Sequence, residues 1–327
     1  MLNHPILIVD DEPTNLAILS MVLEADYSLV FARTGLEALA AVEKHQPCLI
    51  LLDIQMPDMD GYAVCEQLKA NPITEMIPVI FVTSLSEMGN EKAGFAAGCV
   101  DYLSKPIVPE IVLARVRTHL SLVRATQLEK SQRDAIFMLG AAGHYNDNNT
   151  GVHIWRMAAY SKVLARALGW SIPEAELLEL AAPMHDTGKI GIPDAVLKKQ
   201  GGLDAEEWLI MKRHCQIGYD ILSKSDAPIF MLAAEIALCH HERWDGSGYP
   251  QGLVGTAIPE VARIVTLADV FDALTMWRPY KEPWPLDKVV AFITEGAGQH
   301  FDPDMVKVFL GVQDQLMDIK EQFSHKV

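Results

Sequence analysis

The stretch Leu49-Ile50-Leu51-Leu52-Asp53 decides the fold of the first part of the chain. Four consecutive apolar residues end in a single carboxylate, which is typical of a strand buried on both faces. Residues 6–9 and 79–82 repeat the apolar pattern, and residues 14–24 and 35–44 between them have helical periodicity. Alternating strands and helices predict a doubly wound α/β fold with a parallel sheet.

Polar side chains are found where these predicted strands end. Parallel strands end at the same edge of a sheet, so the residues that follow them are expected to lie close together. Three carboxylates, a hydroxyl and an ammonium group at one edge suit a Mg²⁺ ion beside an aspartate that accepts a phosphoryl group. An alternative, ordinary acidic turns, is disfavoured because carboxylates at buried strand ends are costly without a cation. The residues are Asp10, Asp11, Asp53, Thr83 and Lys105.

Residues 1–125 resemble the flavodoxin-like receiver domain of response regulators, with its motifs in the expected order. The resemblance implies that Asp53 is phosphorylated by a sensor histidine kinase and that the other motif residues bind Mg²⁺ or respond to the phosphoryl group. It assigns Mg²⁺ binding to Asp10 and Asp11, and the switch to Thr83, Tyr102 and Lys105.

Helical periodicity continues beyond Pro109 into residues 126–140, which are expected to form a helical linker. Apolar residues recur there at three-four spacing. The first of them, Leu113 and Val116, are expected to pack on the receiver's own sheet. The later ones are expected to face the next domain or a second copy of the chain, which favours a homodimer. They are Leu120, Val123 and Leu128.

The remaining residues, 141–327, have helical spacing and almost no strand-like alternation, which predicts an all-α domain. Its candidate metal ligands are His153, His185, Asp186, His214, His240, His241 and Asp269. Imidazole and carboxylate groups without thiolates suit Fe, Mn, Zn, Co or Ni rather than Mg or Ca. Seven such groups exceed the four around one tetrahedral ion, so we expect two ions that share a bridging carboxylate, that of Asp186.

The adjacent histidines 240 and 241 end a predicted helix and precede a glycine-rich stretch, residues 246–252. Buried imidazoles need partners for both ring nitrogens, which favours metal ligation. By itself, the pair is equally compatible with an exposed helix end. The other candidate ligands favour the metal site.

Residues 140–310 resemble the HD-GYP phosphodiesterases of bacterial cyclic di-GMP signalling. The motifs are His185-Asp186-Thr187-Gly188-Lys189, His240-His241-Glu242 and Gly248-Tyr249-Pro250. The resemblance implies an HD-type helical domain that hydrolyses cyclic di-GMP to pGpG or GMP with two divalent ions, iron or manganese being favoured over nickel, cobalt or zinc.

The same resemblance assigns individual roles. One ion would be held by His153, His185, Asp186 and Asp269, and the other by Asp186, His214, His240 and His241. Lys189 would act with Asp186 in catalysis, facing the scissile phosphate. The substrate pocket would be lined by Tyr249, Asp272, Arg278 and Lys281.

One position departs from the family pattern. Some members have a glutamate four residues before the first histidine ligand, where it helps to hold a third ion. Here that residue is Asn149, a weak metal ligand, so a third ion is not expected.

Charge and composition limit the partners. The net charge of −16 disfavours binding to polynucleotides, and Arg278 and Lys281 are the cations expected to grip a phosphate. No apolar run is long enough to span a bilayer and no signal peptide is evident, so we expect a cytoplasmic protein that is not inserted in a membrane. The five scattered cysteines fit reduced thiols.

The sequence thus predicts a response regulator whose phosphodiesterase activity is controlled by phosphorylation of Asp53. Two alternatives stay open. The substrate could be another cyclic dinucleotide, such as cyclic GMP-AMP. Otherwise the domain could be a catalytically weak sensor or adaptor, which acts through contacts of the Gly-Tyr-Pro segment with proteins such as diguanylate cyclases.

Overall fold

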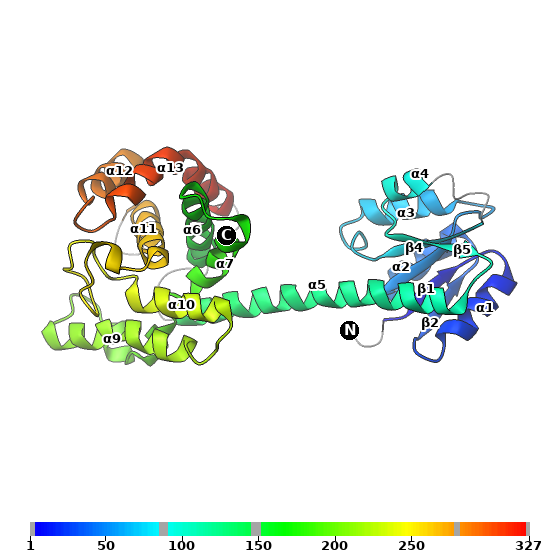
Figure 1. Cartoon of the computed structure of the whole chain (residues 1–327), viewed down its shortest axis with the longest axis horizontal. Coiled ribbons are helices and arrows are strands. Elements are labelled where there is room, and N and C mark those ends of the chain that lie inside the picture. The colour runs from blue at the N-terminus through cyan, green and yellow to red at the C-terminus, as the bar shows by residue number, and fades with distance from the viewer. Residues whose placement is uncertain (1–3, 85–90, 145–151, 278–281, 325–327) are drawn as a thin grey trace. The chain divides into compact units, whose positions relative to one another are not determined.

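The chain folds as two compact units, Met1–Lys130 and Ser131–Val327 (Figure 1). No helix in the described ranges is both long enough and apolar enough to cross a membrane. The computed structural model describes residues 4–84, 91–144, 152–277 and 282–324.

The first unit is a five-stranded parallel sheet with the strand order β2-β1-β3-β4-β5 (Figure 1). The predicted doubly wound α/β fold is confirmed. The strands are β1 (Ile6–Val9), β2 (Leu29–Ala32), β3 (Leu49–Asp53), β4 (Val79–Ser84) and β5 (Asp101–Lys105). The helices are α1 (Pro13–Leu23), α2 (Gly35–His45), α3 (Gly61–Ala70), α4 (Glu91–Ala96) and the first part of α5 (Pro109–His144).

The sheet is buried on both faces, which explains the unbroken apolar runs of β1 and β3. Successive strand residues point to opposite faces. Leu7 and Ile50 therefore pack with α2 and α3 on one face, whereas Ile8 and Leu51 pack with α1 and α5 on the other. Because Asp53 pairs with Val82 in the register of β3 and β4, the polar residues at these strand ends share one edge.

One prediction for α5 was wrong. Leu120 is only 7% exposed and belongs to the core of the first unit with Val112 and Val116, because the four-residue spacing keeps it on the helix face that covers the sheet. Leu128, which was expected to face the next domain or a second copy, is 59% exposed. The homodimer stays a prediction.

The second unit is helical, and the predicted all-α domain is confirmed. Its described residues form isolated β-bridges but no strand. The longer helices are α6 (Val152–Ala167), α7 (Ile172–Ala181), α9 (Ala205–Leu222), α10 (Pro228–Cys239), α11 (Glu260–Thr275), α12 (Leu286–Glu295) and α13 (Pro303–Ser324). The short ones are η2 (Ala182–Met184), η3 (Thr187–Gly191), α8 (Asp194–Leu197) and η4 (Gly255–Ala257).

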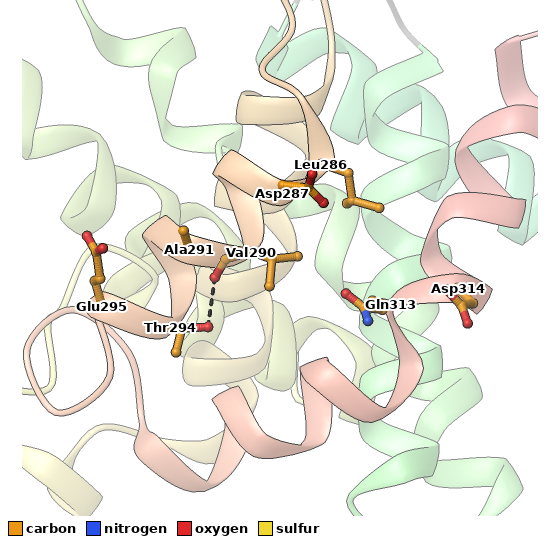
Figure 2. Close-up of a pocket in the computed structure, with 8 residues that line it drawn as sticks. All are labelled: Leu286, Asp287, Val290, Ala291, Thr294, Glu295, Gln313 and Asp314. Atoms are coloured by element: carbon orange, nitrogen blue, oxygen red, sulfur yellow. Dashed lines mark hydrogen bonds between the residues drawn. The ribbon is translucent and has the colours of Figure 1, made fainter.

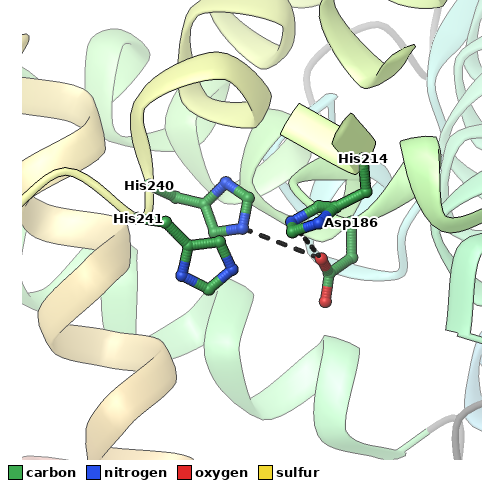
Figure 3. A group of neighbouring side chains, drawn as sticks. All are labelled: Asp186, His214, His240 and His241. Atoms are coloured by element: carbon green, nitrogen blue, oxygen red, sulfur yellow. Dashed lines mark ion pairs between the residues drawn. The ribbon is translucent and has the colours of Figure 1, made fainter. Parts of the chain in front are cut away.

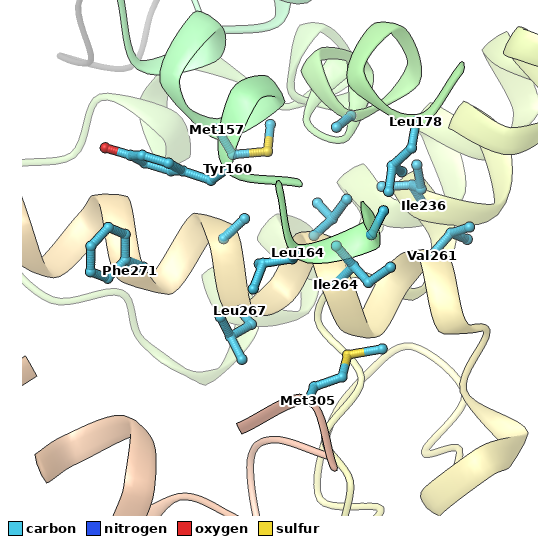
Figure 4. Close-up of a cluster of buried hydrophobic side chains, with 14 of the residues drawn as sticks. Met157, Tyr160, Leu164, Leu178, Ile236, Val261, Ile264, Leu267, Phe271 and Met305 are labelled. Atoms are coloured by element: carbon cyan, nitrogen blue, oxygen red, sulfur yellow. The ribbon is translucent and has the colours of Figure 1, made fainter. Parts of the chain in front are cut away.

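An apolar core holds α6, α10 and α11 side by side (Figure 4). Tyr160 and Phe271 meet edge to face, with their ring centroids 5.2 Å apart, and neither is accessible to solvent. Helices α7 and α9 begin at capping boxes formed by Ser171 and Asp204, which satisfy the first backbone N–H groups. This packing fixes the helices on and between which the candidate ligands lie.

Candidate metal centre

Two short 3₁₀ helices, η2 and η3, flank the first pair of candidate ligands, His185 and Asp186. Gly188 lets this segment lie directly against α9. A Cβ atom at Gly188 would lie 1.9 Å from the carbonyl oxygen of His214 and 2.4 Å from the amide nitrogen of Gly218, so no other residue fits without moving the backbone. This close approach brings Asp186 beside His214.

The seven predicted ligands form two groups. In one, Asp186, His214, His240 and His241 each offer an atom within 4.8 Å of the others (Figure 3). The second group, defined in the same way, consists of His153, His185 and Asp269.

Asp186 lies between the two groups. Its Oδ1 atom is 3.5 Å from Nε2 of His214 and 3.7 Å from Nε2 of His240 (Figure 3). Its Oδ2 atom is 3.3 Å from Nε2 of His185 and 2.8 Å from Nζ of Lys189. The two oxygens of this carboxylate therefore face different groups.

Backbone carbonyls fix the orientation of three imidazoles. The Nδ1 atom of His185 donates to the carbonyl of Ala182 at 3.0 Å, and that of His214 donates to Met211 at 2.7 Å. His240 does the same with the carbonyl of Ile236 at 3.1 Å. A carbonyl can only accept, so Nδ1 carries the proton and the lone pair of Nε2 is directed at the ligand group.

These residues fit a divalent transition-metal ion. The Nε2 atom of His240 is buried and makes no hydrogen bond within the described part of the chain, an arrangement that costs free energy unless a ligand is present. Burial lowers the pKa of His214 to about 4, so its imidazole is neutral near pH 7, as a metal ligand must be. Nitrogen and oxygen donors without thiolates suit such ions.

The glycine-rich stretch packs against the first group. The ring of Tyr249 stacks on that of His241, with their centroids 4.7 Å apart. The buried carboxylate of Glu242 accepts hydrogen bonds from the amides of Gln251 and Leu253 and so holds the loop closed. Gly248 allows the chain to turn here, since a Cβ atom at that position would lie 2.6 Å from the Cα of Glu242.

Asp272 differs from its expected role in the substrate pocket. It is 1% exposed, and both carboxylate oxygens are taken by His153 and Arg156. Although burial would raise the pKa of Asp272, His153 and Arg156 more than offset this effect and hold it below its usual range. Arg156 was missed in the sequence, where its spacing of three residues from His153 was the available signal.

Three residues of the sequence-based prediction lie outside the described ranges. They are the expected phosphate-binding residues Arg278 and Lys281, and Asn149, on which the expectation of two ions rather than three depends.

The polar edge of the first unit also forms a cluster. Asp10, Asp11 and Asp53 each offer an oxygen within 4.8 Å of the others. The ammonium of Lys105 lies 2.7 Å from Oδ2 of Asp53 and 3.0 Å from Oδ2 of Asp10. Burial raises the pKa of Asp53 despite this ammonium. Thr83 is buried on the neighbouring strand, one residue beyond the partner of Asp53.

The predicted switch residue Tyr102 lies on β5 at the surface of the receiver core. Its ring centroid is 5.7 Å from that of Phe81 and 5.3 Å from that of Phe95. The aromatic side chain is therefore held between β4 and α4.

A pocket of about 540 Å³ between α12 and α13 contains none of the predicted site residues (Figure 2). Asp287, Glu295 and Asp314 on its walls give it a negative potential, which disfavours a phosphate-containing ligand. The full lining is Leu286, Asp287, Val290, Ala291, Thr294, Glu295, Gln313 and Asp314.

Comparison with known proteins finds relatives for both units. Residues 6–117 match the response regulator receiver domain family, and residues 121–305 match the HD domain family. The chain is 40% identical to a probable cyclic di-GMP phosphodiesterase of Vibrio cholerae, with 98% of this chain and 80% of the relative covered.

Two further relatives extend this comparison. The chain is 39% identical to the cyclic di-GMP phosphodiesterase response regulator RpfG of Xanthomonas campestris, with 98% of this chain and 90% of the relative covered. A narrower match, 40% identical, covers 59% of this chain and 37% of the 3′3′-cGAMP-specific phosphodiesterase 2 of Vibrio cholerae.

The buried imidazoles predict how stability depends on pH. Burial lowers the pKa of His214 to about 4 and, together with the neighbouring His240, lowers that of His241 well below its usual value. In the unfolded chain these two imidazoles bind protons near pH 6.5, where in the folded, metal-free protein they do not. The free energy of unfolding should therefore fall as the pH falls from about 6.5 to about 4.

Urea unfolding of protein treated with a chelator, at several pH values, measures this dependence. Tryptophan fluorescence follows the second unit, because all six tryptophans lie there. The His214→Gln variant should show a shallower pH dependence. The same slope in variant and wild type would contradict the assignment.

Proposed function

The chain belongs to the response regulators that combine a receiver domain with an HD domain, and we propose that it is a phosphorylation-controlled hydrolase of cyclic di-GMP. One observation carries the proposal: Asp186 lies between two groups of imidazoles and carboxylates and directs one oxygen at each, with Lys189 beside it. Relatives that match nearly the whole chain are cyclic di-GMP phosphodiesterases by name, which supports the substrate.

The seven ligands are suited to bind two divalent transition-metal ions, of which the family resemblance favours iron or manganese. Bound there, such ions would supply Lewis acidity and an activated water for the cleavage of a phosphodiester. Water adds to phosphorus and the bond to the 3′ oxygen breaks, which gives linear pGpG and, after a second cleavage, GMP.

Lys189 contributes a fixed positive charge beside Asp186. Its side chain is 15% exposed, so its ammonium is partly shielded from water. In such a site, a positive charge stabilises the negative charge that develops on phosphoryl oxygens. Tyr249, which covers His241, is a proposed substrate contact at the edge of the same group. Arg278 and Lys281 are proposed to grip the substrate phosphates.

A second substrate is favoured by one specific observation. Part of the chain resembles a phosphodiesterase whose name specifies 3′3′-cGAMP. The phosphodiester chemistry would be the same, because cyclic di-GMP and cyclic GMP-AMP differ in one base. Substrate preference therefore depends on base contacts, not on the metal ligands.

Turnover by metal-loaded protein tests the proposed activity. Protein purified without oxygen should contain two transition-metal ions per chain by elemental analysis and should convert cyclic di-GMP to pGpG or GMP. The same assay with cyclic GMP-AMP ranks the two substrates. Full metal content without turnover of either dinucleotide would contradict the proposal and favour a binding protein.

Substitutions of Asp186 and Arg278 should impair different properties of the enzyme. Loss of Asp186 removes the shared carboxylate, so Asp186→Ala should lose metal and lower kcat by orders of magnitude. Loss of Arg278 removes a charged hydrogen bond to phosphate, so Arg278→Ala should raise KM roughly 10- to 100-fold and keep its metal. The measurements are metal content and steady-state kinetics.

The opposite pattern would overturn these roles. Metal loss in Arg278→Ala would place that residue in the metal centre. Near-normal kcat and full metal content in Asp186→Ala would show that the carboxylate does not bridge the ions.

The presence of a receiver domain supports the proposal that a sensor kinase controls the hydrolase activity. Phosphorylation of Asp53 replaces the single negative charge of its carboxylate with roughly two on the phosphoryl group beside Lys105, enough to change the balance between two arrangements of nearby side chains. Lys105 ends β5, and α5 begins four residues later at Pro109. A movement of Lys105 toward the phosphoryl group thus occurs close in the chain to the start of α5.

The other end of α5 packs on the segment that carries Asp186. A Cβ atom at Gly140 would lie 2.7 Å from the carbonyl oxygen of Pro183, and one at Gly143 would lie 2.9 Å from the Cα of Thr187. Glycine at both positions lets the helix touch the backbone of η2 and η3. A shift of α5 would therefore move the metal ligands, which is the proposed route of control.

Asp53→Asn should abolish the response to a small phosphodonor such as acetyl phosphate and leave basal turnover in place. The amide keeps the size of the side chain but cannot accept a phosphoryl group. Turnover with and without phosphodonor, in wild type and variant, provides the measurement. A variant that still responds would place the input elsewhere.

Gly143→Ala should lower basal turnover roughly tenfold or more, because the added methyl group displaces the backbone beside Asp186. Gly311→Ala is a matched control: it changes a helical glycine with no atom within 4 Å of a new Cβ, and should leave turnover unchanged. Equal activity of the two variants would contradict the proposed contact.

A further inference from the structure

A buried charge network lies behind one of the two ligand groups. The guanidinium of Arg156 donates from Nε to Oδ1 of Asp272 at 2.6 Å and from Nη2 to Oδ2 at 2.9 Å. Nδ1 of His153 meets Oδ2 of Asp272 at 2.6 Å. All three residues are at most 4% exposed, so water contributes little to their solvation.

The network follows from the spacing of residues on two packed helices. His153 and Arg156 are three residues apart on α6, and Asp269 and Asp272 are three residues apart on α11. Residues at this spacing share a helix face. The first residue of each pair thus contributes to the ligand group, where Nε2 of His153 is 3.6 Å from Oδ1 of Asp269. The second residues, Arg156 and Asp272, meet behind it.

Arg156 has no role in binding substrate at this position. Its side chain is 4% exposed, and its charge is already paired with Asp272 in a two-point contact. To bind a substrate phosphate, a guanidinium must be accessible to a ligand that enters from solvent. The contact instead occupies both oxygens of Asp272, which explains how a second carboxylate close to the centre is kept from acting as a ligand.

We propose that Arg156 is a positioning residue, which holds Asp272 so that this carboxylate accepts the Nδ1 proton of His153 and directs Nε2 at the metal ion. The other three imidazoles with fixed rings rely on backbone carbonyls for the same purpose. His153 relies on a side chain, and an unpaired buried carboxylate would not stay in place without the guanidinium. The inference rests on the proposed metal centre but not on the identity of the substrate.

Binding of Co²⁺ to the metal-free full-length protein tests this role without any nucleotide. Wild type should bind two ions, each detected by its visible absorption. In Asp272→Asn and Arg156→Met, one ion should bind roughly 10- to 100-fold more weakly and the other with nearly wild-type affinity. Arg156→Lys keeps the charge but loses the two-point contact, so it should fall between Arg156→Met and wild type.

A second substitution identifies which of the two Co²⁺ ions is bound more weakly. His214→Gln removes a ligand from the group that contains Asp186, His240 and His241. Combined with Arg156→Met, it should leave no tight Co²⁺ site. If one tight site survives in the double variant, Arg156 does not serve the group of His153.

Arg263 provides the matched control. It lies on α11 and pairs with the buried Asp302, but neither residue belongs to a ligand group. Arg263→Lys should leave both Co²⁺ affinities unchanged. Unchanged Co²⁺ affinities in Arg156→Met and Asp272→Asn would overturn the proposal. It would also be overturned if Arg156→Lys, with a normal circular dichroism spectrum, bound both ions equally more weakly than wild type. Fewer than two ions in wild type would instead contradict the proposed metal centre.

Discussion

The carboxylate of Asp186 is the group on which the second unit's chemistry depends. Its two oxygens face two sets of imidazoles, and Lys189 adds one positive charge. A buried carboxylate is costly without cations close to it. The segment that carries Asp186 consists of short 3₁₀ turns with few hydrogen bonds of their own. It is held instead by close backbone contacts, with Gly188 against α9 and Gly143 of α5 against Thr187.

Imidazole orientation is the second constraint, because a neutral histidine binds a metal through one nitrogen only. Hydrogen bonds from Nδ1 to backbone carbonyls three or four residues earlier orient His185, His214 and His240 at no cost in extra side chains. His153 lies in the first turn of α6 and directs Nδ1 at the carboxylate of Asp272. There Asp272 and Arg156 replace the carbonyl.

The two units bring their charged groups together by different means, because their folds differ. In the receiver, Asp53 and Lys105 lie at the ends of parallel strands, where the register of the sheet brings them together. In the helical unit, His153 and His240 lie at helix ends and His185 and Asp186 lie between helices, whereas His214 and Asp269 lie within α9 and α11. Within the second unit, the end of α5 packs on the segment beside Asp186 through Gly140 and Gly143.

The sequence alone determined the two fold classes and the types of residue in both sites. Unbroken apolar runs that end in carboxylates predict a parallel sheet, and helical spacing with histidines predicts an all-α metal domain, because both patterns follow from local periodicity. Packing alone decided the rest. Leu120 lies in the receiver core, and Asp272 supports His153 instead of lining a pocket. Arg156 joins them only because α6 and α11 pack side by side, a contact between residues more than one hundred positions apart that periodicity cannot indicate.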